Sequence, residues 1–250
     1  MAGTAEFDPQ MVISYKFPES TFSYTERDAA LYALGVGACS RDAVDDKELK
    51  YVYHQDGQQS IEVLPTFASL FSTGLQSRII EMPGLVFDPR LLLHGQQYIE
   101  IYKPLPSNGC ILNKATVSGL HDKGKSTVLE VEILSYEKES GVQLCMQRAA
   151  VYLRGAGGFS KSPQPYSYTK YPSGQISTYK IPKSQPFVVF EECTHPSQAL
   201  LYRLSGDYNP LHSDPRVAEI AGVIYQVKVK ERNKAALSGI VTLDRFASSL

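Results

Sequence analysis

A short, mostly apolar pattern occurs twice in this chain. Leu31–Gly37 reads LYALGVG, and Leu201–Asp207 reads LYRLSGD, 170 residues further along. Both stretches are expected to be short helices, and strand-like segments follow each of them. An internal duplication is the simplest explanation, because self-similarity at a fixed offset is what repeated structural units leave in a sequence. The chain is therefore expected to fold as two copies of one unit.

The two copies differ in length. Leu31 to Leu153 spans 123 residues and has room for about four strands, whereas Leu201 to Leu250 spans 50 residues and has room for two. Those two strands are predicted over Val223–Glu231 and Ala235–Leu243. If both copies share a fold, the second lacks about half of its sheet and the helix that this sheet would surround. We therefore predict an internal gap directly after Gly222.

The first copy has the pattern of helices followed by an antiparallel sheet. A helix is predicted over Thr25–Val36, led in by Glu19–Thr21, with a shorter helix over Pro65–Phe71 and an exposed connection over Arg41–Leu49. Strand-like segments then alternate with short turns that contain glycine, which predicts a meander of neighbouring strands. These strands are Leu91–Tyr102, Cys110–Leu120, Ser126–Tyr136 and Val142–Leu153.

A linker is predicted between the copies. Gly155–Pro186 is rich in glycine, serine, proline and tyrosine and lacks apolar periodicity. The division that follows is an N-terminal repeat at 1–154, a linker at 155–186 and a C-terminal repeat at 187–250. We interpret the tyrosines of the linker as anchors that hold a long loop to a surface; they are Tyr166, Tyr168, Tyr171 and Tyr179.

Only the second copy carries a dense polar group. Asp207, Asn209 and His212 fall within six residues, around the turn-forming pair Asn209–Pro210. In a helix, residues five apart point roughly 140° away from each other, so the acid and the imidazole could not share a helical face. Because the proline favours an extended conformation at Asn209, a turn here could bring Asp207 and His212 together. A carboxylate and an imidazole that touch one water form a general acid–base pair.

Two other interpretations of these residues stay open. Asp, Asn, Ser and Gly are ordinary turn residues, so the segment could be a loop that caps a helix. A metal site could use Asp207, His212 and Asp214, although nothing nearby supplies the remaining ligands at a familiar spacing. Asp214 also fits the N-cap of a helix over Arg216–Ala221, with Pro215 at the first helical position.

Composition narrows the class of protein. The chain has 250 residues, of which 43% are hydrophobic and 20% charged, as in ordinary soluble globular proteins. A net charge of −1 and the absence of any nucleic-acid motif argue against nucleic-acid partners. The cysteines are widely spaced and never form C-x-x-C, which indicates reduced thiols and not a disulfide framework or zinc site. They are Cys39, Cys110, Cys145 and Cys193.

The two ends of the sequence bear on location. The first ten residues, MAGTAEFDPQ, lack the basic start and apolar core of a secretory signal, and no apolar run approaches membrane-spanning length. The last three residues, Ser248, Ser249 and Leu250, resemble the small-basic-Leu peroxisomal address, with serine in the middle position. We therefore expect a peroxisomal location, with an import receptor as a partner and no membrane span.

Taken together, these residues resemble a known enzyme family. YRLSGDYNPLHSDP at Tyr202–Pro215 is similar to the signature of type 2 enoyl-CoA hydratases, the MaoC-like (R)-specific hydratases. The resemblance extends over nearly the whole chain. The other matching segments are YALGVGA at Tyr32–Ala38, LPTF at Leu64–Phe67, LLHGQQYIEIYKPLP at Leu92–Pro106, DKG at Asp122–Gly124 and YQVKVKERNK at Tyr225–Lys234.

The resemblance implies an α+β double hot-dog fold, in which each of two repeats wraps a curved antiparallel sheet around a helix. It also implies reversible addition of water to trans-2-enoyl-CoA, giving (3R)-3-hydroxyacyl-CoA, with no cofactor and no metal. Asp207 and His212 match the catalytic pair that holds the water, and Asn209 matches the amide of the same loop. Contacts to the acyl-CoA substrate are implied at His94, Gly95 and Lys123.

The sequence departs from the family pattern after Gly222. The central helix of the second repeat, whose N-terminus would supply backbone N–H donors to the thioester oxygen, is absent together with the next two strands, so the second repeat is expected to be incomplete.

The leading hypothesis is a hydratase of peroxisomal fatty-acid β-oxidation. The alternative is a catalytically inactive, truncated isoform that binds acyl-CoA or a full-length partner. A third hypothesis changes the substrate to an acyl-ACP. A homodimer is a further expected assembly.

Overall fold

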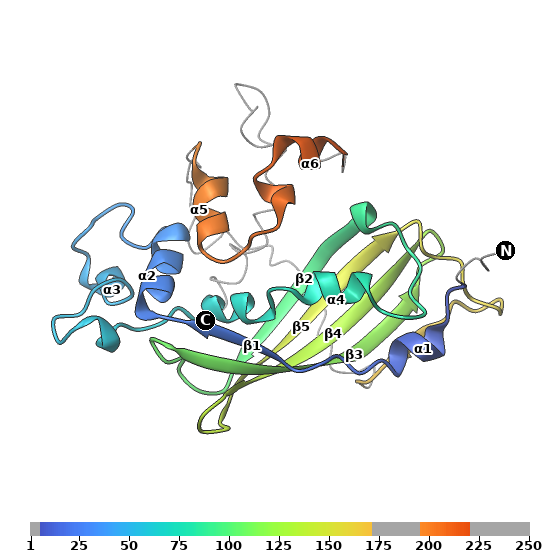
Figure 1. Cartoon of the computed structure of the whole chain (residues 1–250), viewed down its shortest axis with the longest axis horizontal. Coiled ribbons are helices and arrows are strands. Elements are labelled where there is room, and N and C mark those ends of the chain that lie inside the picture. The colour runs from blue at the N-terminus through green and yellow to red at the C-terminus, as the bar shows by residue number, and fades with distance from the viewer. Residues whose placement is uncertain (1–5, 172–195, 221–250) are drawn as a thin grey trace, which may run out of the picture.

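A curved antiparallel sheet forms most of the first copy. The computed structural model of the chain describes residues 6–171 and 196–220 (Figure 1). Within these residues the sheet has six strands in the order β1-β3-β4-β5-β2, with β6 paired to β3. The strands are β1 (Ser20–Tyr24), β2 (Leu92–Ile101), β3 (Gly109–Asp122), β4 (Ser126–Glu137), β5 (Gln143–Arg154) and β6 (Ser167–Thr169).

Of the predicted four-strand meander, the last three strands are confirmed as neighbours in chain order, whereas the first strand, β2, was wrongly placed because it lies beside β5 and not beside β3. Strands β3, β4 and β5 pair antiparallel in chain order, and β2 pairs antiparallel with β5. Gly124 and Gly141, in the two turns between these strands, have φ values of +74° and +71°, a region that residues with a Cβ rarely adopt. The prediction that Glu19–Thr21 leads into a helix is wrong, because Ser20–Tyr24 alternates β-forming residues and pairs with the N-terminal part of β3.

Short helices lie on one side of the sheet. They are α1 (Pro9–Ile13), α2 (Glu26–Gly35), α3 (Asp46–Leu49), α4 (Leu75–Ile80), α5 (Gln198–Leu204) and α6 (Pro215–Ile220). Single turns of 3₁₀-helix are η1 (Gln58–Ser60), η3 (Pro89–Leu91) and η4 (Pro210–His212), and a longer one is η2 (Pro65–Ser72). No described helix is long and apolar enough to cross a bilayer.

The sequence predicted the helices less well than the strands. The helix predicted over Thr25–Val36 is confirmed as α2, with Thr25 at its N-cap. The segment after Pro65 is helical as predicted, but it is a 3₁₀-helix. The exposed connection predicted over Arg41–Leu49 contains the short helix α3, whose N-cap Asp45 accepts a hydrogen bond from the backbone of Lys47.

The main core lies between the sheet and the helices of the first copy. Leu129, Val131 and Ile133 alternate along β4 and are almost fully buried on the same face of the sheet. Val12 of α1 and Ile79 of α4 pack into this cluster from the helical side, and neither is exposed to solvent. A neighbouring cluster around Phe67 and Phe71 joins η2 to β1 and β3. The first copy therefore has a core of its own.

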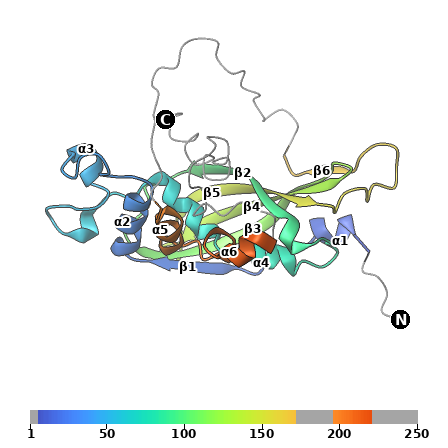
Figure 2. The ribbon, with the colours of Figure 1, turned by 90° about the horizontal axis from the view of Figure 1, so that it is seen from above.

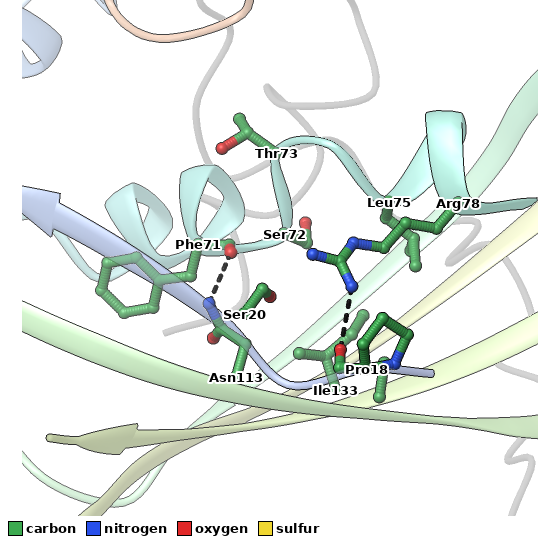
Figure 3. Close-up of a pocket in the computed structure, with 10 residues that line it drawn as sticks. Pro18, Ser20, Phe71, Ser72, Thr73, Leu75, Arg78, Asn113 and Ile133 are labelled. Atoms are coloured by element: carbon green, nitrogen blue, oxygen red, sulfur yellow. Dashed lines mark hydrogen bonds between the residues drawn. The ribbon is translucent and has the colours of Figure 1, made fainter. Parts of the chain in front are cut away.

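Two buried amides hold η2 against the sheet. Asn113 of β3 donates from Nδ2 to the Phe71 carbonyl at 2.8 Å (Figure 3), and Gln147 of β5 donates from Nε2 to the Ala68 carbonyl at 2.8 Å. The first side chain is 3% exposed and the second is fully buried. Carbonyls at the turns of a 3₁₀-helix that point into the core require such partners, because a buried unpaired polar group is costly. Figure 3 shows the small pocket beside this contact, where Arg78 Nη1 donates to the Pro18 carbonyl at 2.9 Å.

The described part of the predicted linker is fastened to the sheet. Strand β6 extends the sheet beside β3, and the rings of Tyr166 and Tyr168 pack against the main core. Asp122 accepts hydrogen bonds from the backbone N–H groups of Gly124 and Gly158, each at 2.8 Å, and from that of Ser160 at 2.9 Å. Burial alone would raise the pKa of Asp122, but these bonds and the Ser160 hydroxyl outweigh it and hold the pKa at about 2.

The second copy is described only at 196–220, and its helix α5 packs against α2. The carbonyl of Gly35 accepts a hydrogen bond from Gln198 Nε2 at 2.8 Å. A Cβ at Gly35 would lie 2.7 Å from Ser205 Oγ, so the two helices approach closely at this point. Gly35 and Ser205 occupy the same position in the repeated pattern, so the two copies of that pattern contact each other.

Several predictions about the second copy lie outside the described residues. These are the strands at 223–231 and 235–243, the gap after Gly222, the end of the linker, Cys193 and the C-terminal tripeptide. The other three cysteines, Cys39, Cys110 and Cys145, are free thiols.

In the views of Figures 1 and 2, α5 and α6 lie above α4 and η2, on the side away from the sheet.

The buried amide of Gln147 provides a test of this packing. Replacing Gln147 by Leu leaves the Ala68 carbonyl and the Gln97 side-chain amide, 3.0 Å away, without a partner. We expect the free energy of unfolding in urea to fall by about 1–3 kcal/mol. Gln143→Leu is the matched control, since Gln143 is only partly buried at the start of β5, and should change stability by less than about 0.5 kcal/mol. Equal effects of the two substitutions would contradict the assignment.

The contact between α2 and α5 is testable through Gly35. Glycine to alanine in a helix ordinarily stabilises by up to about 1 kcal/mol. Here we expect Gly35→Ala to destabilise, because the new methyl group meets Ser205 Oγ. In the double variant Gly35→Ala/Ser205→Ala the next contacts, at 3.7 Å and 3.9 Å, are ordinary, so stability should recover. Urea denaturation of both variants measures this coupling, and a single variant more stable than the parent chain would show that the helices do not meet.

Candidate active site

The candidate site begins at a sharp turn after α5. Gly206 has a φ of +128°, a conformation open to glycine and strained for other residues. A Cβ there would lie 3.4 Å from the methyl groups of Leu70 in η2, so the turn rests directly on the first copy. This turn directs the chain away from α5 and places Asp207 at the start of the loop.

Asp207 and His212 converge, as the Asn209–Pro210 pair predicts. The Asp207 Oδ1 atom accepts the backbone N–H of Asn209 at 3.0 Å, which folds the loop back on itself. Pro210 then begins η4, which ends at His212. As a result His212 Nε2 lies 3.7 Å from Asp207 Oδ2. The side chains are 44% and 27% exposed respectively, so water can reach the space beside both.

Asn209 fastens the loop in two directions. Its Oδ1 atom accepts the backbone N–H of Leu211 at 3.0 Å and so caps η4. Its Nδ2 atom donates to Gln76 Oε1 of α4 at 3.1 Å. Gln76 was missed by sequence reasoning, since the two residues are 133 positions apart and no local pattern marks such a pair. The amide of Asn209 is thus a link between the loop and the first copy.

Tyr202 of α5 completes the polar group. Its hydroxyl donates to Asp207 Oδ2 at 2.8 Å, and its ring meets the His212 ring edge-on, with centroids 5.7 Å apart. Burial, and then the adjacent Asp207 carboxylate, raise the pKa of Tyr202 well above its usual value, so the hydroxyl stays protonated and able to donate. Sequence reasoning missed this residue as well. The one signal for it was its place in the repeated pattern, five positions before the acid.

Asp214 caps the N-terminus of α6. Its Oδ1 atom accepts the backbone N–H of Arg216 at 2.8 Å, and Pro215 is the first residue of α6, which confirms the predicted helix start. Within 6–171 and 196–220, no group of three or more His, Cys, Asp and Glu side chains is arranged to hold a metal ion. The metal interpretation therefore gains no support from the described part of the chain.

The residues implied as substrate contacts lie on the sheet of the first copy. His94 and Gly95 are exposed on β2, at a bulge where the register with β5 shifts, and His94 Nε2 lies 3.0 Å from the Gln96 carbonyl. Gly95 leaves room for a ring, since a Cβ there would lie 2.3 Å from Tyr152. Lys123 is exposed in the turn between β3 and β4. Their roles stay predictions. The predicted absence of the N–H-donor helix after Gly222 also stays a prediction, because that part of the chain lies outside the described residues.

Comparisons with known proteins place the chain in a family. Residues 22–155, more than half of the chain, match the family model described as the MFE-2 hydratase 2 N-terminal domain. A protein of Arabidopsis thaliana named "Enoyl-CoA hydratase 2, peroxisomal" is 48% identical over 304 aligned positions, which cover 98% of each chain. The "Peroxisomal multifunctional enzyme type 2" of Mus musculus is 37% identical over 84% of this chain, which corresponds to 27% of that longer protein.

The length of the Arabidopsis alignment bears on the predicted gap. It spans 304 positions, and this chain has 250 residues in all, so at least 54 aligned positions hold no residue of this chain. Both proteins are nevertheless aligned along 98% of their length. This supports residues missing from the interior of the chain. Their place directly after Gly222 stays a prediction.

A solved structure shows the same fold. The crystal structure of a MaoC-like dehydratase from Phytophthora capsici matches 96% of this chain and 77% of that protein, with a TM-score of 0.69 and 27% sequence identity. The α+β hot-dog architecture expected from the sequence is thereby confirmed. With a family model matched over more than half of its residues, and a hydratase 2 relative matched over nearly all of them, this chain belongs to the hydratase 2 family and has the MaoC-like hot-dog fold.

Proposed function

We propose that this chain is an (R)-specific 2-enoyl-CoA hydratase, a lyase that adds water to trans-2-enoyl-CoA and yields (3R)-3-hydroxyacyl-CoA in peroxisomal fatty-acid β-oxidation. One observation carries the proposal. A dense polar loop in the described part of the second copy, 196–220, brings Asp207 and His212 within 3.7 Å of each other and leaves both partly open to water. The chain that carries this loop belongs to the hydratase 2 family and is 48% identical to a peroxisomal enoyl-CoA hydratase 2.

The chemistry needs two proton transfers around one water. As the water oxygen attacks C3 of the enoyl thioester, a base removes a proton from it, and an acid delivers a proton to C2. The sum is the addition of one water molecule across the double bond. We assign these transfers to the Asp207–His212 pair, because a carboxylate and an imidazole side by side can hold one water and exchange its protons.

The other site residues have supporting roles in this proposal. Asn209 is assigned to hold the loop, since both ends of its amide are already engaged with Leu211 and Gln76. His94 and Gly95 are assigned to the bound acyl-CoA, and Lys123 to its phosphates, because an exposed ammonium can pair with phosphate oxygens. The thioester oxygen gains negative charge during the reaction and needs N–H donors. In the family those donors belong to the helix that would follow Gly222, and this sequence is predicted to lack that helix.

A second candidate function rests on the length of the alignment. At least 54 positions of the plant relative have no counterpart in this chain. If they include the N–H donors, the chain would bind an acyl-CoA, or pair with a full-length copy, without turning the substrate over. Titration calorimetry with an acyl-CoA, beside a hydration assay on the same preparation, separates the two functions. Binding without turnover identifies the inactive isoform.

The catalytic assignment predicts a defined loss of activity. Purified chain given trans-2-enoyl-CoA should consume it, as followed by the decrease in enoyl-thioester absorbance. Asp207→Asn and His212→Gln should each lower kcat by about 10²–10⁴-fold, the usual contribution of a positioned acid or base. Asp214→Asn is the matched control, since asparagine caps a helix as well as aspartate does and Asp214 serves α6. If the Asp207→Asn variant and the His212→Gln variant both keep the parent activity, the catalytic assignment is wrong.

The peroxisomal location has its own test. The tripeptide Ser248–Leu250 is proposed to bind the import receptor. A fluorescent protein fused to the N-terminus should therefore collect in peroxisomes, and deletion of these three residues should release it into the cytosol. Cytosolic fluorescence from both fusions refutes the proposal. A deletion variant that still enters peroxisomes shows that a different segment is the address.

A further inference from the structure

We propose that Tyr202 is a positioning residue, whose hydroxyl holds the Asp207 carboxylate in the orientation that faces His212. The hydroxyl oxygen lies 2.8 Å from Asp207 Oδ2, the same carboxylate oxygen that lies 3.7 Å from His212 Nε2. The inference deepens the function proposed above and rests on it, because it assigns a residue that acts through the Asp207–His212 pair.

The two oxygens of Asp207 are held by separate donors. Oδ1 accepts the backbone N–H of Asn209 at 3.0 Å, and Oδ2 accepts the Tyr202 hydroxyl. One bond alone would leave the carboxylate free to turn about that oxygen, whereas two donors on different sides fix its plane. The Tyr202 bond is the one that sets the oxygen beside His212, because the Asn209 bond engages the other oxygen.

Tyr202 is itself held firmly enough to act in this way. It lies within α5, which packs on α2 through Ser205 and Gln198. Its ring stands at 87° to the His212 ring, so one side chain contacts both members of the pair. The raised pKa of its hydroxyl keeps the proton in place over the working range of an acid–base pair.

The first copy has a tyrosine at the corresponding position, but this tyrosine does not hold a carboxylate. Tyr32 occupies the position in the first copy that corresponds to Tyr202, and Gly37 occupies that of Asp207. The Tyr32 side chain is 3% exposed, and its hydroxyl lies beside the Thr66 and Ser69 side chains, with no hydrogen bond to a carboxylate of the described residues. A tyrosine is therefore common to both copies of the pattern, and of the two hydroxyls only that of Tyr202 donates to a carboxylate. The polar link is specific to the copy that carries the acid and the imidazole.

Tyr202→Phe removes the hydroxyl and keeps the ring. We expect kcat for hydration to fall by roughly 10- to 100-fold, the range for losing a hydrogen bond to a charged group. KM should change little, because Tyr202 is assigned no contact with the substrate. Tyr208→Phe is the matched control: its ring is 60% exposed and lies over Arg203, 4.8 Å from ring centroid to guanidinium carbon, a contact that phenylalanine keeps. Tyr208→Phe should leave both constants unchanged.

The outcomes separate this inference from the function on which it rests. If Asp207→Asn abolishes hydration while Tyr202→Phe keeps the parent kcat, the positioning role is overturned and the proposed function stands. If Asp207→Asn is fully active, the proposed function fails. A fall in kcat for Tyr202→Phe that Tyr208→Phe shares also overturns the role, since it then reflects a general disturbance of the loop.

A spectroscopic test decides the positioning bond even in a preparation without turnover. Tyrosines carrying ¹³C at the hydroxyl-bearing ring carbon give one NMR signal each, and the signal lost in Tyr202→Phe identifies Tyr202. That signal should move in Asp207→Asn, because the acceptor changes from a carboxylate to a neutral amide, and should stay in place in Asp214→Asn. A Tyr202 signal that does not respond to Asp207→Asn overturns the proposal, whatever the activity.

Discussion

The contact between the Gly206 turn and Leu70 determines where the polar loop lies. Leu70 belongs to η2, and η2 is held to the sheet by hydrogen bonds from the buried amides of Asn113 and Gln147. Those amides are fixed because β3 and β5 are central strands of the sheet. A continuous series of contacts thus runs from the sheet of the first copy to the start of the loop. The first copy thus supports the loop that carries the proposed acid–base pair.

This dependence bears on the gap predicted in the second copy. The Asp207–His212 pair relies on α5, on η2 and on the amide link to Gln76, all of which lie in the described residues. None of these contacts uses the chain beyond Gly222. The loop therefore does not depend on the segment in which the family resemblance would place the N–H donors. If the residues missing from this chain include the predicted N–H donors, stabilisation of charge at the thioester oxygen would be lost while the Asp207–His212 pair keeps its contacts.

The features predicted from the sequence are those with local causes. The strand meander followed from alternating side chains and glycine turns, and the convergence of Asp207 with His212 followed from one Asn-Pro pair. Strand β1 could not be predicted in the same way, because five residues form it only by pairing with β3, near residue 110. Tyr202 and Gln76 were not predicted from the sequence for a related reason. Their roles depend on a partner that the fold brings near, and no residue type or spacing identifies that partner in advance.

The duplication explains why the first copy can serve as a support. In both copies a helix with the same tyrosine leads to a turn, but the chain continues as Gly37 in one and as Asp207 in the other. The matching helices lie against each other at Gly35 and Ser205, so each copy forms part of the surroundings of its counterpart. A single copy carrying the polar loop would leave α5 without this surface and the Gly206 turn without Leu70. The surroundings of Asp207 in the described residues therefore come from both repeats, including the one without the acid and the imidazole.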